Sequence, residues 1–535
     1  MKSSKNAEVL VVFFVGLSLF TVGLGQRDFL GLECRFGLFA KAMWENGITL
    51  YPMLYGQPYA DYPAMHTLLM YWSSLLFGQV TITAAVLPTA IAAAITLALT
   101  YLIGTFHSQR LALWAVVLEL GTFAFFAYAR NIAMDHFVAT LTALCFYLVH
   151  LWTLRGGHWR LCLIVIAWLA GFALRGPIGM VIPAAVVFAY FAAERHWRMA
   201  LAMGIAAAVS LALASATLFY LAYLTGGDAL LQLVWTMQVS TRFGDSHAKP
   251  VYYYLVNSLG DYTITMPIAL LLLWISRKRL LQPSACTDGL SLLRPCAAWF
   301  LIILIGMSIP KAKAGRYILA IAPAISLIAA HLFCATWSMP WLGRCKSLLL
   351  WLCRAMPWIG LVGIWCGFWL IRHNPWGIEI SPLPVTAVLL GLAFASWWLL
   401  NKPNRLSSNR ELVMAATGVL TFIAIQILVA EPASVALMSS KPFVQQVEAL
   451  REPHETLIFY HGPDSNDIKY MVHVERLFTP QFIMSPEALL AWRQPACLLV
   501  EKKSLAKLPP GIWPRSRIVL EGSLAHKPYV VIKLK

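Results

Sequence analysis

Charged residues are scarce in this sequence, at 12% of its 535 positions, whereas 59% of the positions are hydrophobic. A soluble domain carries about twice that share of charge, because its surface faces water. Lysine and arginine outnumber acidic residues by 41 to 24, an excess that could indicate a nucleic-acid partner. These basic residues instead separate apolar runs, so the composition indicates an integral membrane protein with no nucleic-acid partner.

Paired cysteine motifs are also missing. The ten cysteines form no CxxC pair and no metal-finger spacing. Most of them fall in or beside apolar segments, where cysteine behaves as a small apolar residue. The cysteines therefore give no sign of a structural metal site.

Apolar segments long enough to cross a membrane recur through the first 430 residues. A helix needs roughly 20 apolar residues to cross the hydrocarbon core, and in lipid only a helix satisfies the backbone of a single segment. We count about 13 such segments. They are 8–26, 80–105, 111–128, 135–154, 160–174, 177–193, 199–223, 252–276, 295–310, 317–338, 347–371, 383–400 and 411–430. The sequence thus predicts an α-helical polytopic membrane protein, with a transmembrane domain over residues 1–430.

The basic residues predict the orientation of these spans. With Lys2 and Lys5 in the cytoplasm, every second connection should also be cytoplasmic, and cytoplasmic loops are rich in lysine and arginine. Those connections hold Arg110, Arg155, Arg160, Arg195, Arg198, Arg277, Lys278, Arg279, Arg344, Lys346, Lys402, Arg405 and Arg410. An odd number of spans then places the C-terminal segment outside. We expect a bacterial inner-membrane protein with a cytoplasmic N-terminus and a periplasmic active site.

Residues 27–79 form a long connection between the first two spans, and long loops in compact proteins are usually functional. Apolar side chains recur at helical spacing from Phe36 to Trp44 and again from Met65 to Leu76. A turn signal from Tyr55 to Pro58 separates the two runs. The pattern predicts two amphipathic helices that lie at the membrane interface.

Ionisable residues gather in five loops on the predicted outer side. The carboxylates are Glu33, Asp61 and Asp135, the cations are Arg35, Arg175, Lys311, Lys313 and Arg316, and His247 completes the set. Asp135 stands at a membrane boundary, where an ionisable group is costly and usually functional. A helix N-terminus is the alternative explanation for Glu33 and Asp135. The basic stretch 311–316 breaks the positive-inside trend, which indicates an anionic partner such as a lipid phosphate.

The order of these residues resembles that of GT-C glycosyltransferases of the protein O-mannosyltransferase type, and among them the bacterial transferases that add aminoarabinose to lipid A. The resemblance covers most of residues 1–340. The matching stretches are Leu32 to Phe36, Glu45 to Pro52, Gly56 to Pro63, Asp135, Arg175 to Pro177, His247 to Pro250 followed by Tyr252 to Tyr254, and Lys311 to Leu319. Two positions depart from the family pattern, because Leu32 stands at its usual Asp and Tyr62 at a frequent Lys.

The resemblance implies transfer of a sugar from a polyprenyl-phosphate carrier to an acceptor, with inversion. A phosphate leaving group needs positive charge. The candidates for this are Arg35, Arg175, Lys311, Lys313 and Arg316, with Tyr317 beside them. A hydroxyl acceptor needs a carboxylate to take its proton, and Glu33, Asp61 and Asp135 all remain candidates. Tyr59 and His247 are the candidate substrate-binding residues.

Neither the acceptor nor the need for a metal follows from these residues. The resemblance favours lipid A or another glycolipid as the acceptor, with a protein as the alternative. If the acceptor is a lipid phosphate, no proton has to be removed, and the carboxylates would position groups or bind a cation. Their grouping with His247 or His136 would allow a divalent metal ion, although no spacing demands one.

Residues 431–535 differ in character from the rest of the chain. Short apolar runs at 457–460, 497–500 and 530–534 predict buried strands, and Ser485-Pro486 predicts a helix start. We expect a small α/β domain outside the membrane.

A transporter or lipid flippase is the rival function. Transporters place ionisable groups near the middle of the membrane, often between inverted repeats. Here the sequence shows no clear repeat, and the ionisable residues cluster at one face. This distribution favours an enzyme working at the membrane interface.

Overall fold

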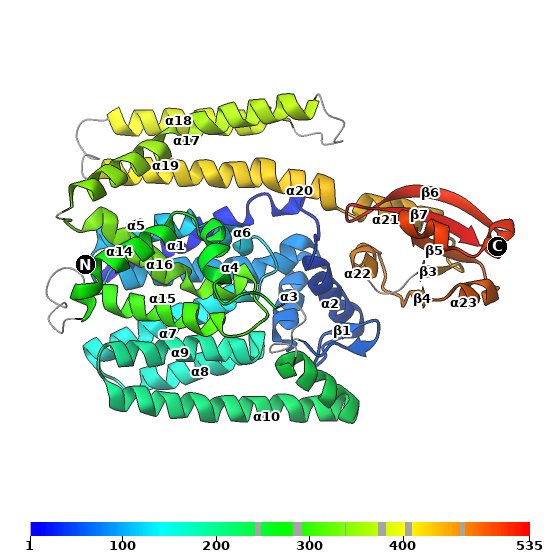
Figure 1. Ribbon diagram of the computed structural model, residues 1–535, viewed down its shortest axis with the longest axis horizontal. Coiled ribbons are helices and arrows are strands. Elements are labelled where there is room, and N and C mark those ends of the chain that lie inside the picture. Colours follow the sequence, from blue (N-terminus) through cyan, green and yellow to red (C-terminus); the bar gives the residue numbers. More distant parts are fainter. Residues whose placement is uncertain are drawn as a thin grey trace.

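The computed structural model describes residues 2–61, 63–240, 248–281, 292–337, 339–372, 381–401, 409–460 and 466–534. A bundle of long helices makes up most of the molecule, and a small α/β domain projects from one end of it (Figure 1). We call this end of the bundle the domain end. The N-terminus lies at the opposite end of the bundle (Figure 1).

The bundle contains the predicted membrane spans. Its main helices are α1 (Lys2–Thr21), α4 (Ile82–Gly104), α5 (Gln109–Leu120), the short α6 (Phe123–Ala129), α7 (Asp135–Arg155), α8 (Trp159–Arg175), α9 (Pro177–Ala193), α10 (Trp197–Trp235), α14 (Thr265–Leu281), α15 (Leu293–Ser308), α16 (Ala322–Cys334), α17 (Pro340–Arg372), α18 (Leu383–Asn401) and α19 (Arg410–Ile425). In the described part of the chain, eight helical segments are long and apolar enough to cross a membrane alone, and α5 with α6 would make a ninth. The prediction of a polytopic helical membrane protein is confirmed.

Two predicted spans differ in detail from the structure. The segment predicted at 111–128 is bent by 70° between α5 and α6, where Thr122 leaves the helical conformation. The Thr122 hydroxyl lies 2.9 Å from that of Thr265 on α14, which fixes the bend in the core. The segment predicted at 252–276 is not one helix, because α12 (Tyr253–Val256) and α13 (Ser258–Asp261) precede α14. Gly260 and Asp261 interrupt the apolar run at this point.

The connection 27–79 folds into α2 (Glu33–Asn46), a hairpin of β1 (Met53–Leu54) and β2 (Gln57–Pro58), and α3 (Met65–Phe77). Tyr55 and Gly56 have positive φ and form the hairpin turn. The apolar face of α2 is buried in a core that it shares with the C-terminal domain. That face is therefore covered by protein, whereas α3 leaves Leu75 and Leu76 exposed.

The C-terminal domain contains a five-stranded sheet with the order β4-β3-β5-β7-β6. Its strands are β3 (Thr456–Tyr460), β4 (Gln481–Ile483), β5 (Ala496–Glu501), β6 (Ser516–Leu524) and β7 (Lys527–Leu534). The central strands β3 and β5 are parallel, and β7 pairs antiparallel with β5 and β6. The predicted small α/β domain is confirmed. The polar edge strand β6 was not predicted, because it lacks a buried apolar run.

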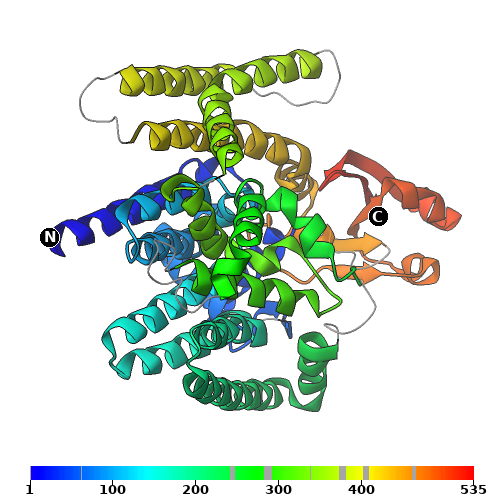
Figure 2. The same ribbon diagram turned by 60° about the vertical axis from the view of Figure 1, so that its left-hand side comes forward.

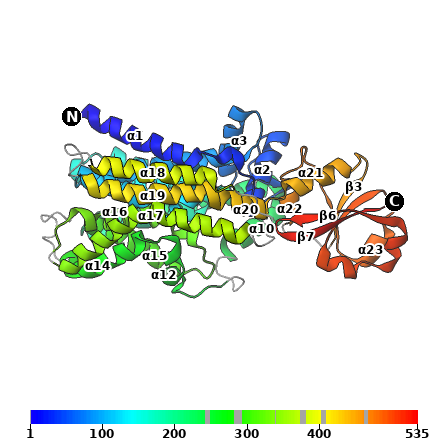
Figure 3. The same cartoon turned by 90° about the horizontal axis from the view of Figure 1, so that it is seen from above.

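A long helical rod joins the bundle to this domain. α19 continues through a π-helical segment, η6 (Gln426–Ala430), into α20 (Glu431–Met438), and α21 (Lys441–Leu450) follows. α17, α18 and α19 form a layer along one side of the bundle (Figures 2 and 3). The rod therefore brings residues 426–438 beside the loops at the domain end.

Candidate active site

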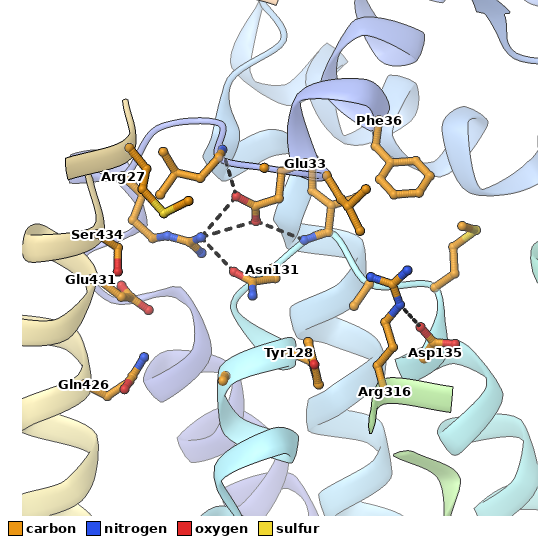
Figure 4. A pocket seen from close by; sticks show the side chains of 18 of the residues that line it. Arg27, Glu33, Phe36, Tyr128, Asn131, Asp135, Arg316, Gln426, Glu431 and Ser434 are labelled. Carbon is orange, nitrogen blue, oxygen red and sulfur yellow. Dashed lines mark hydrogen bonds and ion pairs between the residues drawn. The ribbon is translucent and has the colours of Figure 1, made fainter. Parts of the chain in front are cut away.

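A cavity of about 350 Å³ lies at the domain end of the bundle (Figure 4). Its wall combines the connection from α1 to α2, the loop between α6 and α7, the start of α7 and the rod from η6 to α20. Arg175 and Arg316 reach it from two further elements. Segments far apart in the sequence thus meet around one space.

Asp135 receives two guanidinium groups at this cavity. Its Oδ1 lies 3.4 Å from Nε of Arg175, and its Oδ2 lies 3.6 Å from Nε of Arg316. The Asp135 and Arg175 side chains are buried, while Arg316 remains 28% exposed. Both guanidinium groups also lie over the ring of Tyr317, at 5.8 and 5.6 Å from its centre. A carboxylate and two cations are therefore held at one point of the cavity wall.

Local sequence explains how these side chains reach the same place. Asp135 begins α7, where an acid suits the positive end of the helix dipole. Arg175 ends α8, and Gly176 with φ of 69° makes the sharp turn into α9, which begins at Pro177. Arg316 lies in the 3-10 segment η4 (Gly315–Ile321) that leads into α16.

Glu33 forms a second polar group in the same wall (Figure 4). Its carboxylate accepts from Nη2 of Arg27 at 3.2 and 3.3 Å and from the backbone N–H groups of Leu30 and Ile132 at 3.3 Å. Arg27 also donates to Oδ1 of Asn131 at 2.7 Å. Burial raises the pKa of Glu33, and Arg27 opposes that rise. These contacts join the two loops of the wall, so Glu33 is occupied as a positioning group.

A buried ion pair fixes the rod to the bundle. Nε and Nη2 of Arg130 each lie 2.7 Å from an oxygen of Glu431, and the Arg130 side chain is fully buried. Nη1 of Arg130 donates to the carbonyl oxygens of Leu19 and Phe20 at 3.0 and 3.2 Å. α1, the loop before α7 and α20 therefore meet at one guanidinium group.

Other predicted site residues lie away from this cavity. Nη1 of Arg35 donates to the Tyr59 hydroxyl at 3.0 Å. Burial raises the pKa of Tyr59, with Arg35 lowering it and Asp61 raising it. The carbonyl of Asp61 accepts from Nε2 of Gln238 at 2.7 Å. Arg35, Tyr59 and Asp61 do not line the cavity with Asp135, and their predicted roles stay predictions.

The two lysines of the basic stretch are also placed elsewhere. Lys313 is buried and donates to the carbonyl oxygens of Lys249 and Pro310, at 3.1 and 2.5 Å. Lys311 is exposed and does not line the cavity. Among the cations predicted to hold the donor phosphate, only Arg175 and Arg316 reach the cavity. The candidate substrate-binding residue His247 lies outside the described residues.

Several wall residues were not predicted as site residues. They are Arg27, Tyr128, Asn131, Gln426, Glu431 and Ser434. Arg27 follows the first span, where a basic residue is ordinary, and Glu431 ends an apolar run 404 residues further along. The one usable signal was an acid at the edge of a span, which applies to Glu431 as it did to Asp135.

The described part of the chain contains no cluster of side chains arranged to bind a metal ion. No three side chains of His, Cys, Asp or Glu come together there with the geometry to hold a metal ion. His136, which the sequence placed near Asp135, points its Nε2 to the carbonyl of Phe125 at 3.1 Å.

Comparisons with known proteins agree with this architecture. Residues 61–239 match the family model described as dolichyl-phosphate-mannose-protein mannosyltransferase. The structure of ArnT from Cupriavidus metallidurans in the apo state superposes with a TM-score of 0.72 at 15% identity, covering 99% of this chain and 98% of that one. The same protein bound to undecaprenyl phosphate gives 0.71 at 15% identity, covering 98% of each chain. No curated protein matches significantly. The predicted GT-C fold is confirmed over nearly the whole chain.

Proposed function

We propose that this protein is a membrane glycosyltransferase, which moves a sugar from a polyprenyl-phosphate donor to an acceptor at the outer face of the bacterial inner membrane. The observation that carries the proposal is the meeting of Asp135 with Arg175 and Arg316 at a cavity at one end of a membrane bundle. The fold is that of ArnT, which has been solved with undecaprenyl phosphate. A lipid-linked donor suits a site at the end of a membrane bundle, where lipid headgroups lie.

The residues of the cavity suit the chemistry of such a transfer. When the bond between the sugar and the phosphate breaks, negative charge develops on the phosphate oxygens. Arg316 is partly exposed and Arg175 is buried, so together they offer a fixed charge with an accessible side. Arginine donors also match phosphate geometry in pairs. Attack from the face opposite the phosphate inverts the anomeric carbon.

Asp135 is our candidate for the catalytic carboxylate. A hydroxyl acceptor loses its proton as it attacks, and a carboxylate within hydrogen-bond reach takes that proton. Glu33 lines the same cavity, but its oxygens already accept from Arg27 and two backbone N–H groups. If the acceptor is a phosphate, Asp135 instead positions the two arginines, because there is no proton to remove.

We favour a glycolipid of the lipid A type as the acceptor. The order of motifs in this sequence resembles that of the transferases that modify lipid A, and the fold agrees over nearly the whole chain. A protein acceptor is the second candidate. It is favoured by the matching family model, whose description names a protein mannosyltransferase over residues 61–239.

Mass spectrometry of lipid A and other envelope glycolipids tests this proposal. Extracts of cells with and without the gene are compared, and a gene encoding Asp135→Asn is returned to the deletion strain as a control. We expect a sugar-sized mass that is present with the native gene and absent in the other two strains. Identical glycolipids in all strains, with unchanged glycoproteins, would contradict the proposal.

A further inference from the structure

A second polar cavity, of about 420 Å³, lies between the bundle and the C-terminal domain. The connection from α1 to α2, α2 itself and the start of α4 form its bundle side. The start of α21 and the segment after α22 (Asn466–Met471) form its other side. Arg27 lines this cavity and the one that holds Asp135, so the two are neighbours.

Positive charge dominates the wall of this interdomain cavity. Arg27, Lys41 and Lys441 line it, and Asp28 is the one carboxylate among its described lining residues. Asp28 is already engaged by the hydroxyl of Ser439 and by the backbone N–H of Phe29. The cavity also borders the N-terminus of α4, whose backbone N–H groups add a positive dipole. Arg27 is paired with Glu33 and Asp28 is occupied, so the two ammonium groups of Lys41 and Lys441 leave a net attraction for an anion.

The ammonium form of Lys41 is destabilised in this cavity. Burial lowers the pKa of Lys41, and the nearby Lys441 pushes it in the same direction, while Glu45 and Glu475 raise it. The Lys41 ammonium group donates to the carbonyl of Val474 at 2.6 Å, which fixes it between the two domains. Two ammonium groups brought together in a partly buried space repel each other, and a bound anion would relieve that repulsion.

His473 supplies an independent sign of a ligand. Its side chain is only 3% exposed, and Nδ1 lies 3.5 Å from Oδ1 of Asp28. Nε2 is buried and has no hydrogen-bond partner among the described residues. Burial lowers the pKa of His473 to about 4; Asp28 raises it, and Lys41 and Lys441 lower it further. A buried polar atom without a partner costs free energy unless a ligand or water satisfies it.

We propose that this interdomain cavity is a phosphate-binding site, in which Arg27, Lys41, Lys441 and His473 hold a phosphate group. An anion in the cavity favours the imidazolium form of His473, which donates from Nδ1 to Asp28 and from Nε2 to the phosphate. α1 ends at Thr21 and α4 begins at Ile82 beside the cavity. The cavity thus lies where membrane helices end, at the depth of lipid headgroups, so a phosphorylated lipid can reach it.

The place of this site in the reaction rests on the proposed function. Arg27 separates the interdomain cavity from the one with Asp135, so a lipid held by its phosphate here has its sugar part next to Asp135. The phosphate would then belong to the acceptor, while Arg175 and Arg316 hold the donor. The structure thereby offers one cationic cavity to each lipid substrate.

Binding of a short-chain phosphatidic acid to the full-length protein in detergent tests the site. The wild type should bind it saturably, and Lys441→Gln and His473→Gln should each weaken binding about tenfold, as expected for loss of one charge-assisted hydrogen bond. Lys441→Arg should restore binding. Lys507→Gln, which removes an exposed lysine elsewhere in the C-terminal domain, is the matched control and should bind normally. Thermal unfolding checks that each variant is folded.

Unchanged affinity in folded Lys441→Gln and His473→Gln proteins would overturn the site, as would binding that is lost in Arg316→Ala alone. Competition by millimolar inorganic phosphate assigns the site to the phosphate ion, and binding that resists it assigns the site to the lipid-borne group. Sugar transfer is measured separately, so that a wild type that binds phosphatidic acid but transfers no sugar contradicts the proposed function alone.

Discussion

Among single residues, Asp135 is central to the candidate site, because two guanidinium groups converge on it. Arg175 is held by packing and by its place before Gly176, whereas Arg316 is partly open to the cavity. A carboxylate placed between two cations orients both of them before a substrate arrives. Such preorganisation lowers the barrier to a reaction that develops negative charge at that point.

Asp135→Asn tests the role of the carboxylate. The amide keeps the shape of the side chain but cannot act as a base. It also loses the ion pairs with Arg175 and Arg316. With a hydroxyl acceptor, we expect kcat to fall by about 100-fold or more, the usual contribution of a general base. Donor affinity should change much less. Transfer assays in nanodiscs measure both, and a variant with native kcat would remove Asp135 from the mechanism.

Arg316→Ala tests the phosphate contact. Loss of one positive charge at the leaving group should lower kcat/KM for the donor by about 100-fold. Arg155→Ala is the matched control, because Arg155 is exposed at the opposite end of α7 from Asp135. Equal transfer rates in the two variants would show that Arg316 does not act on the donor.

Only part of this site was predictable from the sequence. Asp135, Arg175, Arg316 and Glu33 were predicted because charges are rare near membrane spans and therefore conspicuous. The neighbouring wall residues Arg27 and Asn131 were not predicted, because each looks ordinary in its local sequence. Glu431 was missed although it is an acid at the edge of a span. Arg130 and Glu431 are 301 positions apart, and only the tertiary fold brings them together.

At the scale of elements, the buried pair of Arg130 and Glu431 ties the rod of α19 and α20 to the bundle. Removing one partner of a buried pair leaves the other charge without compensation and costs about 3–5 kcal/mol. We therefore expect Glu431→Gln to lower the unfolding temperature of the detergent-solubilised protein markedly. Glu411→Gln is the control, since Glu411 is partly exposed, and each of its solvent-exposed pairs, with Arg110 and with Lys346, should contribute about 0–1 kcal/mol. Equal shifts in both variants would contradict the structural role.

The hairpin of α8 and α9 depends on two glycines. Gly171 and Gly179 pack so closely that a Cβ on either would overlap the carbonyl oxygen of the other. A Cβ at Gly179 would also lie 2.9 Å from Cβ of Arg175, so this contact positions a site residue. Close backbone contact of this kind is typical of helices packed in membranes.

Gly179→Ala should therefore destabilise the protein by about 1–3 kcal/mol, the usual cost of overpacking, and lower the transfer rate by moving Arg175. Gly204→Ala is the matched control on α10, where the nearest side-chain atom would be an ordinary 3.7 Å away. Thermal unfolding and transfer assays on both proteins measure the two effects. A fully active and stable Gly179→Ala protein would show that the close contact is not needed.

At the scale of the whole molecule, the fold was largely predictable because lipid restricts the choices. Spans must be helical, and scarce charges mark their ends, so the segment boundaries follow from composition. The bend between α5 and α6 was not predictable, because Thr122 takes part in a long-range contact with Thr265. That the C-terminal domain covers α2 was also not predictable from the sequence. An amphipathic pattern does not say whether lipid or protein contacts the apolar face of a helix.

The membrane orientation is a prediction at this scale. The helix order puts the basic connections at the end of the bundle that holds the N-terminus, opposite the C-terminal domain (Figure 1). We expect a periplasmic C-terminus, because positive loops stay in the cytoplasm. Alkaline phosphatase fused after Lys535 should be active, and green fluorescent protein fused at the same point should be dark. The reverse pattern would place the cavity on the cytoplasmic side.

Sugar transfer by the purified protein is the decisive test of the proposed function. Full-length protein in lipid nanodiscs is supplied with a panel of undecaprenyl-phosphate-linked labelled sugars and with lipid A. We expect labelled glycolipid and an equal amount of released undecaprenyl phosphate with the wild type, and neither above background with the Asp135→Asn, Arg316→Ala double variant. Transfer at the same rate by the double variant, or no transfer from any donor to lipid A or to protein acceptors, would contradict the proposed function.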